Sequence, residues 1–320
     1  MVIESFREKM AGLFGIADSF GNQVKKLFNP SKVRIDNFIF TLHHQWTFVI
    51  VIVGLIFATG NNYLNKDAMI CNGGNSYVNA FCFLHGSAHV AKSLQEEITS
   101  ATACVSEDDD DTGENRTTTY YIWLPFILAI IAIMIKMPWI LWKNILERGL
   151  MKKLNADMDQ DGSKTAERFL KVVLRGRRYS IPALVYNFGF AFCEMLNLAV
   201  VLISQSILDS LLNSEFASYG LNVQNYRSFV NDEALRKLPE AVGPRNPMCH
   251  LFPTEVSCSV RTGGITGNAN RENILCLLPN NIFYQYYFLI LWWWWVVLIF
   301  ITCLGLVYRL VQITVPAFGR

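Results

Sequence analysis

The eight cysteines of this 320-residue chain are the residues whose chemistry says most about it. Two of them, Cys193 and Cys303, lie in long apolar stretches, where a thiol packs as a small hydrophobic group. The other six are divided equally between two polar stretches, as Cys71, Cys82 and Cys104 and as Cys249, Cys258 and Cys276. In an oxidising compartment such cysteines form disulfides that contribute about 2–4 kcal/mol each, although their spacing does not specify the pairing.

Three other groups of residues resemble metal sites, and each lacks a feature that binding requires. The stretch 157–168 imitates the acidic opening of an EF-hand loop, but Arg168 stands at the twelfth position, where the bidentate glutamate belongs. His43 and His44 are adjacent, so on a helix they point about 100° apart and cannot easily share one ion. The acidic run 107–111 has no regular ligand spacing. Because there is also no nucleophile elbow or phosphate loop, the sequence predicts no enzyme, no metal site and no cofactor.

Membrane helices are the elements that must position the cysteines. The chain is 52% hydrophobic and only 17% charged, with a mean hydropathy of +0.26. Its clearest span, 120–142, is long enough to cross about 30 Å of hydrocarbon at a rise of about 1.5 Å per residue. Tyrosine and tryptophan lie at both of its ends, as they do at membrane–water interfaces. With three further apolar stretches, the prediction is an all-α membrane protein with transmembrane helices at 38–60, 120–142, 183–210 and 283–310.

The distribution of charge between the spans predicts which loops lie in the cytosol. Residues 143–180 hold ten Lys or Arg against five Asp or Glu, whereas residues 61–119 hold three against nine. The positive-inside rule therefore places the first of these segments in the cytosol and the second outside the cell. The predicted order is a cytoplasmic N-terminal segment (1–37), an external loop (61–119), a cytoplasmic loop (143–182), a second external loop (211–282) and a short cytoplasmic tail (311–320). Both cysteine-bearing loops are then external, where disulfides persist.

Two segments outside the spans carry patterns that bear on function. The N-terminal segment has an amphipathic helical stripe that includes Ile3, Phe6, Met10 and Leu13. Such a helix either rests on a surface, of the membrane or of other subunits, or lines a pore. In the first external loop, Asn115 begins an N-glycosylation sequon immediately before the second span.

The third span carries polar residues on one side. At 100° per residue, the positions within an arc of about 140° include Glu194, Asn197 and Gln205. Polar groups in a spanning helix rarely face lipid, so this face is turned toward other helices or toward water. Between these two alternatives, helix-to-helix hydrogen bonding is slightly favoured over a conducting pore.

The second span begins YYIWLP, with Tyr120, Tyr121, Trp123 and Pro125, and it ends with Pro138 followed by LWK at 141–143. These residues resemble the YYxWxP hallmark and the P-x-x-LWK ending of the innexins, the invertebrate gap-junction proteins. Similarity to the same family continues in five other places, at 34–43, 192–198, 215–220, 252–282 and 308–310. The resemblance therefore covers nearly the whole chain.

The resemblance implies a subunit of a large-pore channel in the plasma membrane. Innexins assemble as rings, typically octamers, in some cases with other innexins, and two rings on apposed cells dock through their external loops. Ions and small metabolites then diffuse passively between the cells, and lipids and apposed rings are the implied partners, with no nucleic acid. The family uses two cysteines per external loop, whose positions are taken here by Cys71 and Cys82 and by Cys258 and Cys276. The amphipathic N-terminal segment would fold into the pore mouth.

Departures from the family pattern leave alternatives open. Cys104 and Cys249 are additional, and they would form a third bridge, remain free or link subunits. A glycan on Asn115 would lie beside the docking surface and hold the ring as an unpaired hemichannel that behaves like a pannexin. The remaining alternative is a four-span adhesion or organiser protein. A connexin is excluded, because the first loop lacks the C-x6-C-x3-C spacing of that family.

Overall fold

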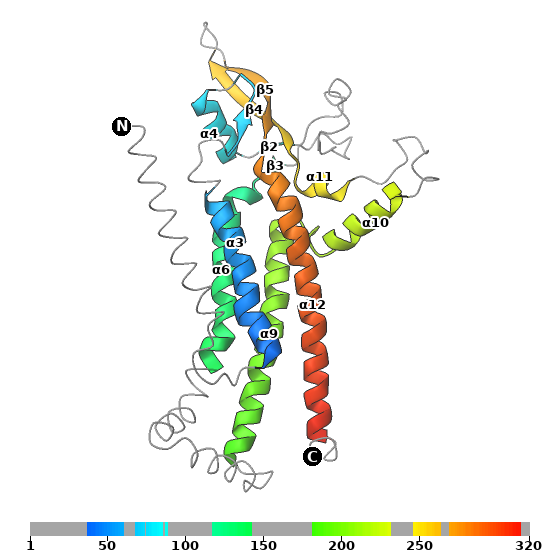
Figure 1. Ribbon diagram of the computed structural model, residues 1–320. Coiled ribbons are helices and arrows are strands. Elements are labelled where there is room, and N and C mark those ends of the chain that lie inside the picture. The colour runs from blue at the N-terminus through cyan, green and yellow to red at the C-terminus, as the bar shows by residue number, and fades with distance from the viewer. Residues whose placement is uncertain are drawn as a thin grey trace, which may run out of the picture.

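Long helices form the part of the chain that is able to cross a membrane (Figure 1). The computed structural model describes residues 37–60, 68–73, 75–85, 87–88, 117–142, 181–231, 246–263 and 269–314. The long helices are the first span, made of α2 (Phe38–Thr41), η1 (Leu42–Thr47) and α3 (Phe48–Thr59), then α6 (Tyr120–Leu141), α9 (Ile181–Leu211) and α12 (Asn280–Thr314). Within the described ranges, four candidate spans result: Phe38–Thr59, Tyr120–Leu141, Phe188–Leu211 and Asn280–Val311. The predicted four-helix membrane part is therefore confirmed.

Helix α6 shows how the apolar residues divide between the bundle and the lipid. Leu124, Leu128 and Ile131 are buried, at steps of four and three that place them on one face of the helix. Phe126 and Ile133 lie on the opposite face and are more than half exposed. Both faces are apolar because one packs against protein and the other faces the hydrocarbon.

The first span packs closely against α12 at a glycine. A Cβ atom at Gly54 would lie 2.2 Å from the Tyr287 ring, so only glycine fits at this crossing. The Tyr287 hydroxyl donates a hydrogen bond of 3.2 Å to the Ile50 carbonyl. One turn further along, the rings of Phe57 and Phe283 stack with their centroids 3.5 Å apart.

Two buried histidines lie in η1, a π-helical segment of the first span. The Thr302 hydroxyl donates to the Leu298 carbonyl, so its oxygen is left to accept from Nε2 of His43 at 2.7 Å. His44 contacts the Phe40 carbonyl at 2.8 Å, and its ring stacks on Trp139 at a centroid distance of 5.5 Å. Each imidazole has its own protein contacts, as expected of histidines that join helices rather than bind one metal ion.

A five-stranded antiparallel sheet stands at one end of the bundle, and the sequence analysis did not predict it (Figure 1). The strand order is β1-β5-β4-β2-β3, with β1 at Ile70–Cys71, β2 at Ser87–Ala88, β3 at Thr117–Thr118, β4 at Glu255–Gly263 and β5 at Ala269–Leu277. The two long strands pair in register from Glu255 with Leu277 to Gly263 with Ala269. The membrane part is all-α as expected, and the predicted extracellular domain contains this sheet, here called the head sheet.

Three short helices complete the described structure around the head sheet. They are α4 (Ser76–His85), α10 (Tyr219–Asn231) and α11 (Pro247–Leu251). The side chain of Asn246 caps α11 by accepting a hydrogen bond of 3.1 Å from the Met248 amide, and Pro247 occupies the first turn, where its missing N–H costs nothing. In Figure 1, α10 projects sideways from the head end of α12.

Candidate functional site: the disulfide-bonded head and the polar contacts beneath it

Two disulfides join the first predicted external loop to the second. Cys71 is bonded to Cys276 and Cys82 to Cys258, with S–S distances of 2.03 and 2.02 Å. Cys71 and Cys276 are register partners on β1 and β5, whereas the second bridge fastens α4 to β4. The bonded residues are 205 and 176 positions apart. Each bridge therefore crosses between the loops, and neither closes within one loop.

The two bridges lie together in the interior of the head. The Sγ atoms of Cys71, Cys82 and Cys276 are all within 4.8 Å of one another, and these side chains are at most 5% exposed. A set of three cysteine sulfurs resembles a zinc site, but a disulfide sulfur has no thiolate charge with which to bind zinc. The cluster is a covalent centre of the head and not a metal site.

The remaining cysteines fall into two kinds. Cys249, on α11, is also disulfide-bonded. Cys104, the other additional cysteine, lies outside the described residues. Cys193 on α9 and Cys303 on α12 are the free cysteines in the part of the chain that the structure describes. Both lie within candidate spans; Cys193 is buried, as expected of a packing residue, whereas Cys303 is exposed on α12.

The two tyrosines that open the family motif attach α6 to the head. The Tyr120 hydroxyl donates a hydrogen bond of 2.7 Å to Oδ1 of Asn281, and Nδ2 of Asn281 donates to the Pro253 carbonyl. The Tyr121 hydroxyl donates to the Phe83 carbonyl of α4 at 3.2 Å. These contacts join the first turns of α6 and α12 to both loop segments, so the head is fixed to the spans as well as bonded internally.

Phe252 is the centre of an aromatic cluster directly beneath the head sheet. Its buried ring stacks on Phe288 at 5.1 Å and makes edge contacts with Tyr120 at 5.5 Å and Tyr219 at 5.8 Å. Gln285 donates to the Phe252 carbonyl at 2.9 Å. Burial, with a smaller contribution from a neighbouring tyrosine, raises the pKa of Tyr219, so its hydroxyl stays protonated and donates to the Gln285 carbonyl at 3.0 Å.

The rest of the family motif lies along α6. Trp123 is 59% exposed and points away from the bundle, as an interfacial tryptophan does. Pro125 and Pro138 are both buried inside the helix. Pro125 lies in the second turn, where the N–H that proline lacks is easiest to replace.

Glu194 connects three segments of the bundle. This residue of α9 is 3% exposed and forms an ion pair with Arg309 of α12, in which Nη2 donates to Oε1 at 3.0 Å. Nδ2 of Asn37, immediately before α2, donates to the same Oε1 at 3.3 Å. The guanidinium of Arg309 also lies 4.5 Å from the centre of the Phe190 ring. These contacts favour the helix-to-helix interpretation of Glu194.

The other polar residues of α9 differ in their surroundings. Asn197 is 3% exposed and Ser204 1%, and the Ser204 hydroxyl donates to the Val200 carbonyl at 2.7 Å. Gln205 is half-buried. Nδ2 of Asn197 has no hydrogen-bond partner among the described residues. The predicted polar face is thus mostly enclosed by the helices of its own chain.

Some of the predicted site residues lie outside the described part of the chain. These are the N-terminal stripe of Ile3, Phe6, Met10 and Leu13, and the sequon residue Asn115.

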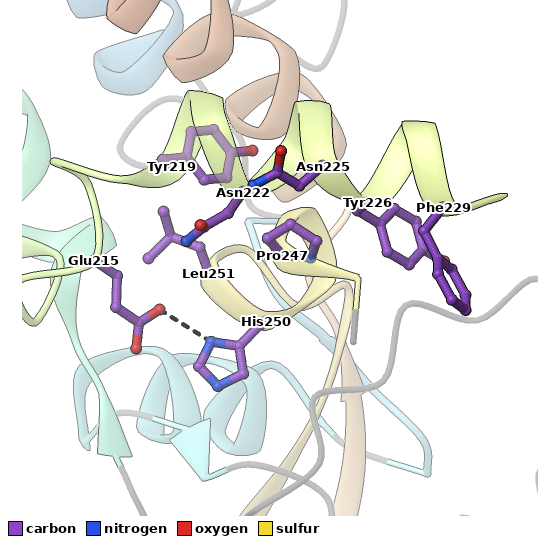
Figure 2. Close-up of a pocket in the computed structure, with 9 residues that line it drawn as sticks. All are labelled: Glu215, Tyr219, Asn222, Asn225, Tyr226, Phe229, Pro247, His250 and Leu251. Atoms are coloured by element: carbon purple, nitrogen blue, oxygen red, sulfur yellow. Dashed lines mark hydrogen bonds and ion pairs between the residues drawn. The ribbon is translucent and has the colours of Figure 1, made fainter. Parts of the chain in front are cut away.

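A pocket of about 600 Å³ lies between α10 and α11 (Figure 2). One wall is α10, which contributes Tyr219, Asn222, Asn225, Tyr226 and Phe229. In Figure 2 the Asn222 side chain extends toward Leu251, and Tyr226 and Phe229 lie toward the far end of α10. Burial of Tyr219 and its bond to Gln285 hold the first turn of this wall against α12.

The opposite wall of the pocket carries a contact between a histidine and a carboxylate. It consists of Pro247, His250 and Leu251 of α11 together with Glu215, which precedes α10. Nδ1 of His250 lies 2.9 Å from Oε2 of Glu215, and both side chains are 30% exposed. Sequence reasoning did not find this pair, because its partners are 35 positions apart and neither lies in a metal-site or catalytic motif.

Comparison with known proteins identifies the family. A model of the innexin family matches residues 36–320. The chain is an innexin. Innexins are gap-junction channel subunits of the plasma membrane, a channel family and not an enzyme family.

Similar innexins from insects cover most of this chain. Innexin inx3 of Drosophila melanogaster is 25% identical over 314 residues, which cover 95% of this chain and 76% of the relative. Innexin inx1 of Schistocerca americana is 28% identical over 304 residues, covering 92% and 80%. Innexin shaking-B of Drosophila melanogaster is 26% identical over 303 residues, covering 92% and 78%. The channel function of the family therefore applies to this innexin.

The structure also explains motif residues to which sequence reasoning had given no role. Asn281 belongs to the stretch that resembles the innexin second loop, and it joins Tyr120 to the head. Arg309 belongs to the stretch that resembles the end of the last span, and it pairs with Glu194. Their polar side chains at the two ends of an otherwise apolar helix were the available signal, because such groups need partners where water is scarce.

Proposed function

We propose that copies of this innexin form a ring around a central pore, an octamer by analogy with the family, and that two rings on apposed cells dock through their heads. The observation that carries this proposal is the pair of disulfides that bond both loops into one sheet above four spans. Docking needs a surface whose shape survives contact with another cell. A covalently closed sheet that is hydrogen-bonded to the ends of α6 and α12 meets that need.

The sidedness of the chain follows from its charges and its disulfides. Disulfides persist outside the cytosol, which supports a position of the head on the cell exterior. The excess of Lys and Arg in residues 143–180 supports a cytosolic position for that loop and, with four spans, for both termini. The two arguments are independent and give the same orientation.

The pore itself is proposed to be passive and lined in part by the N-terminal stripe of Ile3, Phe6, Met10 and Leu13. The hydrogen bond from Asn37 to Glu194 supports this arrangement, because it attaches the last residue of the N-terminal segment to α9 and, through Arg309, to α12. Ions and small metabolites would diffuse through the ring. Other innexins are proposed as further subunits of mixed rings.

The experiment that tests this function is dual voltage-clamp recording from paired cells that lack other junction proteins. The expected result is current between cells when both express this innexin, together with sensitivity of that current to deletion of residues 2–20. Cells that express the Cys303→Ser variant are the matched control, because Cys303 is a free cysteine outside the head.

Two other results would contradict the docking proposal. Current across single-cell membranes without current between cells would favour a non-docking hemichannel, and removal of the sequon by Asn115→Gln would then show whether a glycan prevents docking. Surface expression without either current would favour a four-span organiser protein.

A further inference from the structure

We infer that Arg261 and Arg271 form a basic docking site that binds acidic side chains from the first external loop of a copy in the apposed ring. The two residues are here called the arginine pair. The inference deepens the proposed docking and rests on it, because it names the residues and the charge through which one head recognises another.

The arginine pair occupies an exposed face of the long hairpin. Arg261 of β4 and Arg271 of β5 are register partners, so their side chains lie side by side on the same face of the head sheet. Ser259 and Asn273 are the next register partners on that face, and all four side chains are exposed. The opposite face of β4 is buried, and the disulfide of Cys258 fastens α4 to it. The hairpin thus presents two positive charges to the solvent.

These two charges are not offset within the described part of the chain. Neither guanidinium has an ion-pair partner there. Glu272 directly follows Arg271, but successive side chains of a strand point to opposite faces. Glu255 is on the same face as Arg261, but it lies six positions away, about 20 Å along β4. Like charges directly opposite each other destabilise a sheet, and an acidic partner bound across both arginines would remove that repulsion.

The position of the hairpin favours a partner on another cell. In Figure 1, β4 and β5 extend to the end of the head that is farthest from the four spans. Arg261 and Arg271 lie in the distal half of the hairpin, beyond the part with which β1 and β2 pair. Because the spans are embedded in the membrane, this distal end is the part of the head that an apposed ring reaches.

The first external loop supplies the complementary charge. Residues 61–119 hold nine Asp or Glu against three Lys or Arg, and five of the acids follow one another at 107–111. These five residues lie outside the described part of the chain, and it is their sequence that assigns them as the acidic partner. Two identical rings that face each other are related by two-fold axes, so every contact between them occurs twice, with the roles of the two copies exchanged. Two arginine pairs would repel each other, whereas an arginine pair and the acidic loop of the apposed copy attract.

Charge reversal in paired cells tests the arginine pair. The double variant Arg261→Glu with Arg271→Glu sets acids against the acidic loop of the apposed copy. Junctional conductance between two cells that express it should therefore fall about tenfold or more. Arg227→Glu is the matched control, because Arg227 is an exposed arginine of the same loop on α10. Surface labelling and the membrane current of single cells report whether each variant reaches the membrane and forms a pore.

A mixed pair of cells then tests the acidic partner. A loop variant carries Asp108→Lys, Asp109→Lys, Asp110→Lys and Asp111→Lys. It should also fail when both cells express it, because its added positive charges meet the arginine pair. When one cell expresses the double arginine variant and the other the loop variant, opposite charges meet in both directions. The conductance of this mixed pair should return to within about threefold of the wild-type value.

Each other outcome overturns a defined part of the inference. Wild-type conductance between cells that express the double arginine variant would overturn the arginine pair and leave docking standing. A loss of current that the mixed pair does not reverse would overturn the acidic loop of the apposed copy as the partner. Membrane current without junctional current in the wild-type protein would overturn docking and the inference together. If the double arginine variant does not reach the surface, Arg261→Gln with Arg271→Gln replaces it, with an expected loss of about threefold.

Discussion

At the scale of single residues, two glycines allow neighbouring segments to pack closely against the last span, α12. A Cβ at Gly54 would lie 2.2 Å from Tyr287, and a Cβ at Gly220 would lie 2.1 Å from Trp292. The first contact joins the first span to α12, and the second holds the start of α10 against the same helix. Both distances are far below van der Waals contact, so neither site accepts even a methyl group without movement of a large ring.

The variant Gly220→Ala is expected to lower the free energy of unfolding by about 1–3 kcal/mol, because the added methyl group displaces the Trp292 ring and breaks its bond to Ala217. Gly60→Ala is the matched control, since nothing lies within 4 Å of a Cβ at that position. Thermal unfolding in detergent, followed by tryptophan fluorescence, measures both variants. Equal unfolding temperatures for the two variants would contradict the close contact.

At the scale of elements, the ends of the helices opposite the head are joined by one buried carboxylate. Glu194 is bonded to Arg309 of α12 and to Asn37 at the entry to α2. A buried charge is costly unless it is paired, so the three segments are held in one arrangement. The same contact connects the N-terminal segment to the bundle, which makes Glu194 a positioning residue for the proposed pore lining.

The single variant Arg309→Glu should destabilise the bundle by about 2–4 kcal/mol and shift voltage gating, because it places two carboxylates together in a partly buried site. The exchanged pair Glu194→Arg with Arg309→Glu should recover part of both effects, since it restores opposite charges. Thermal unfolding and the voltage dependence of junctional current measure these effects. Arg261→Glu, at an exposed position of β4, is the control for thermal stability. If the exchanged pair recovers neither thermal stability nor voltage gating, the ion pair between Glu194 and Arg309 does not explain these effects.

At the scale of the whole molecule, the chain consists of an apolar bundle and a covalently closed head. The head is assembled from segments that lie more than 170 positions apart. Its disulfides connect the loop before α6 to the loop before α12. Cys249 adds a further bond at α11. We propose Cys104 as its partner, because the other four loop cysteines are bonded to one another and the last two lie in spans.

Loss of the bridge between α4 and β4, in Cys82→Ser or Cys258→Ser, is expected to lower the free energy of unfolding by about 2–5 kcal/mol and to abolish junctional current. The reason is that the head would lose its fixed shape while the four spans still insert. Surface labelling and paired-cell recording separate these two outcomes, with Cys303→Ser as the control. Full current in either head variant would contradict the docking role.

Peptide mapping without reduction should also recover Cys104 joined to Cys249.

The head sheet is the element that sequence reasoning missed, although one signal for it was present. Val256, Cys258 and Val260 are buried and alternate with polar residues, which is the period of a strand with one buried face. The short strands β1, β2 and β3 have only two residues each, and no local pattern of that length predicts a strand. They exist because of the long hairpin of β4 and β5: β1 pairs with β5 and β2 with β4, and β3 in turn pairs with β2.

The sequence by itself determined the four spans and the family and predicted the orientation of the spans, because hydropathy, charge bias and the YYxWxP motif are properties of contiguous residues. It also determined that six cysteines lie in polar segments. Only the tertiary structure decided that Cys71 pairs with Cys276, that Glu194 faces Arg309 and that Glu215 meets His250 beside a pocket. These partners are far apart in the chain, and they meet only after strand register and helix packing have brought their backbones together.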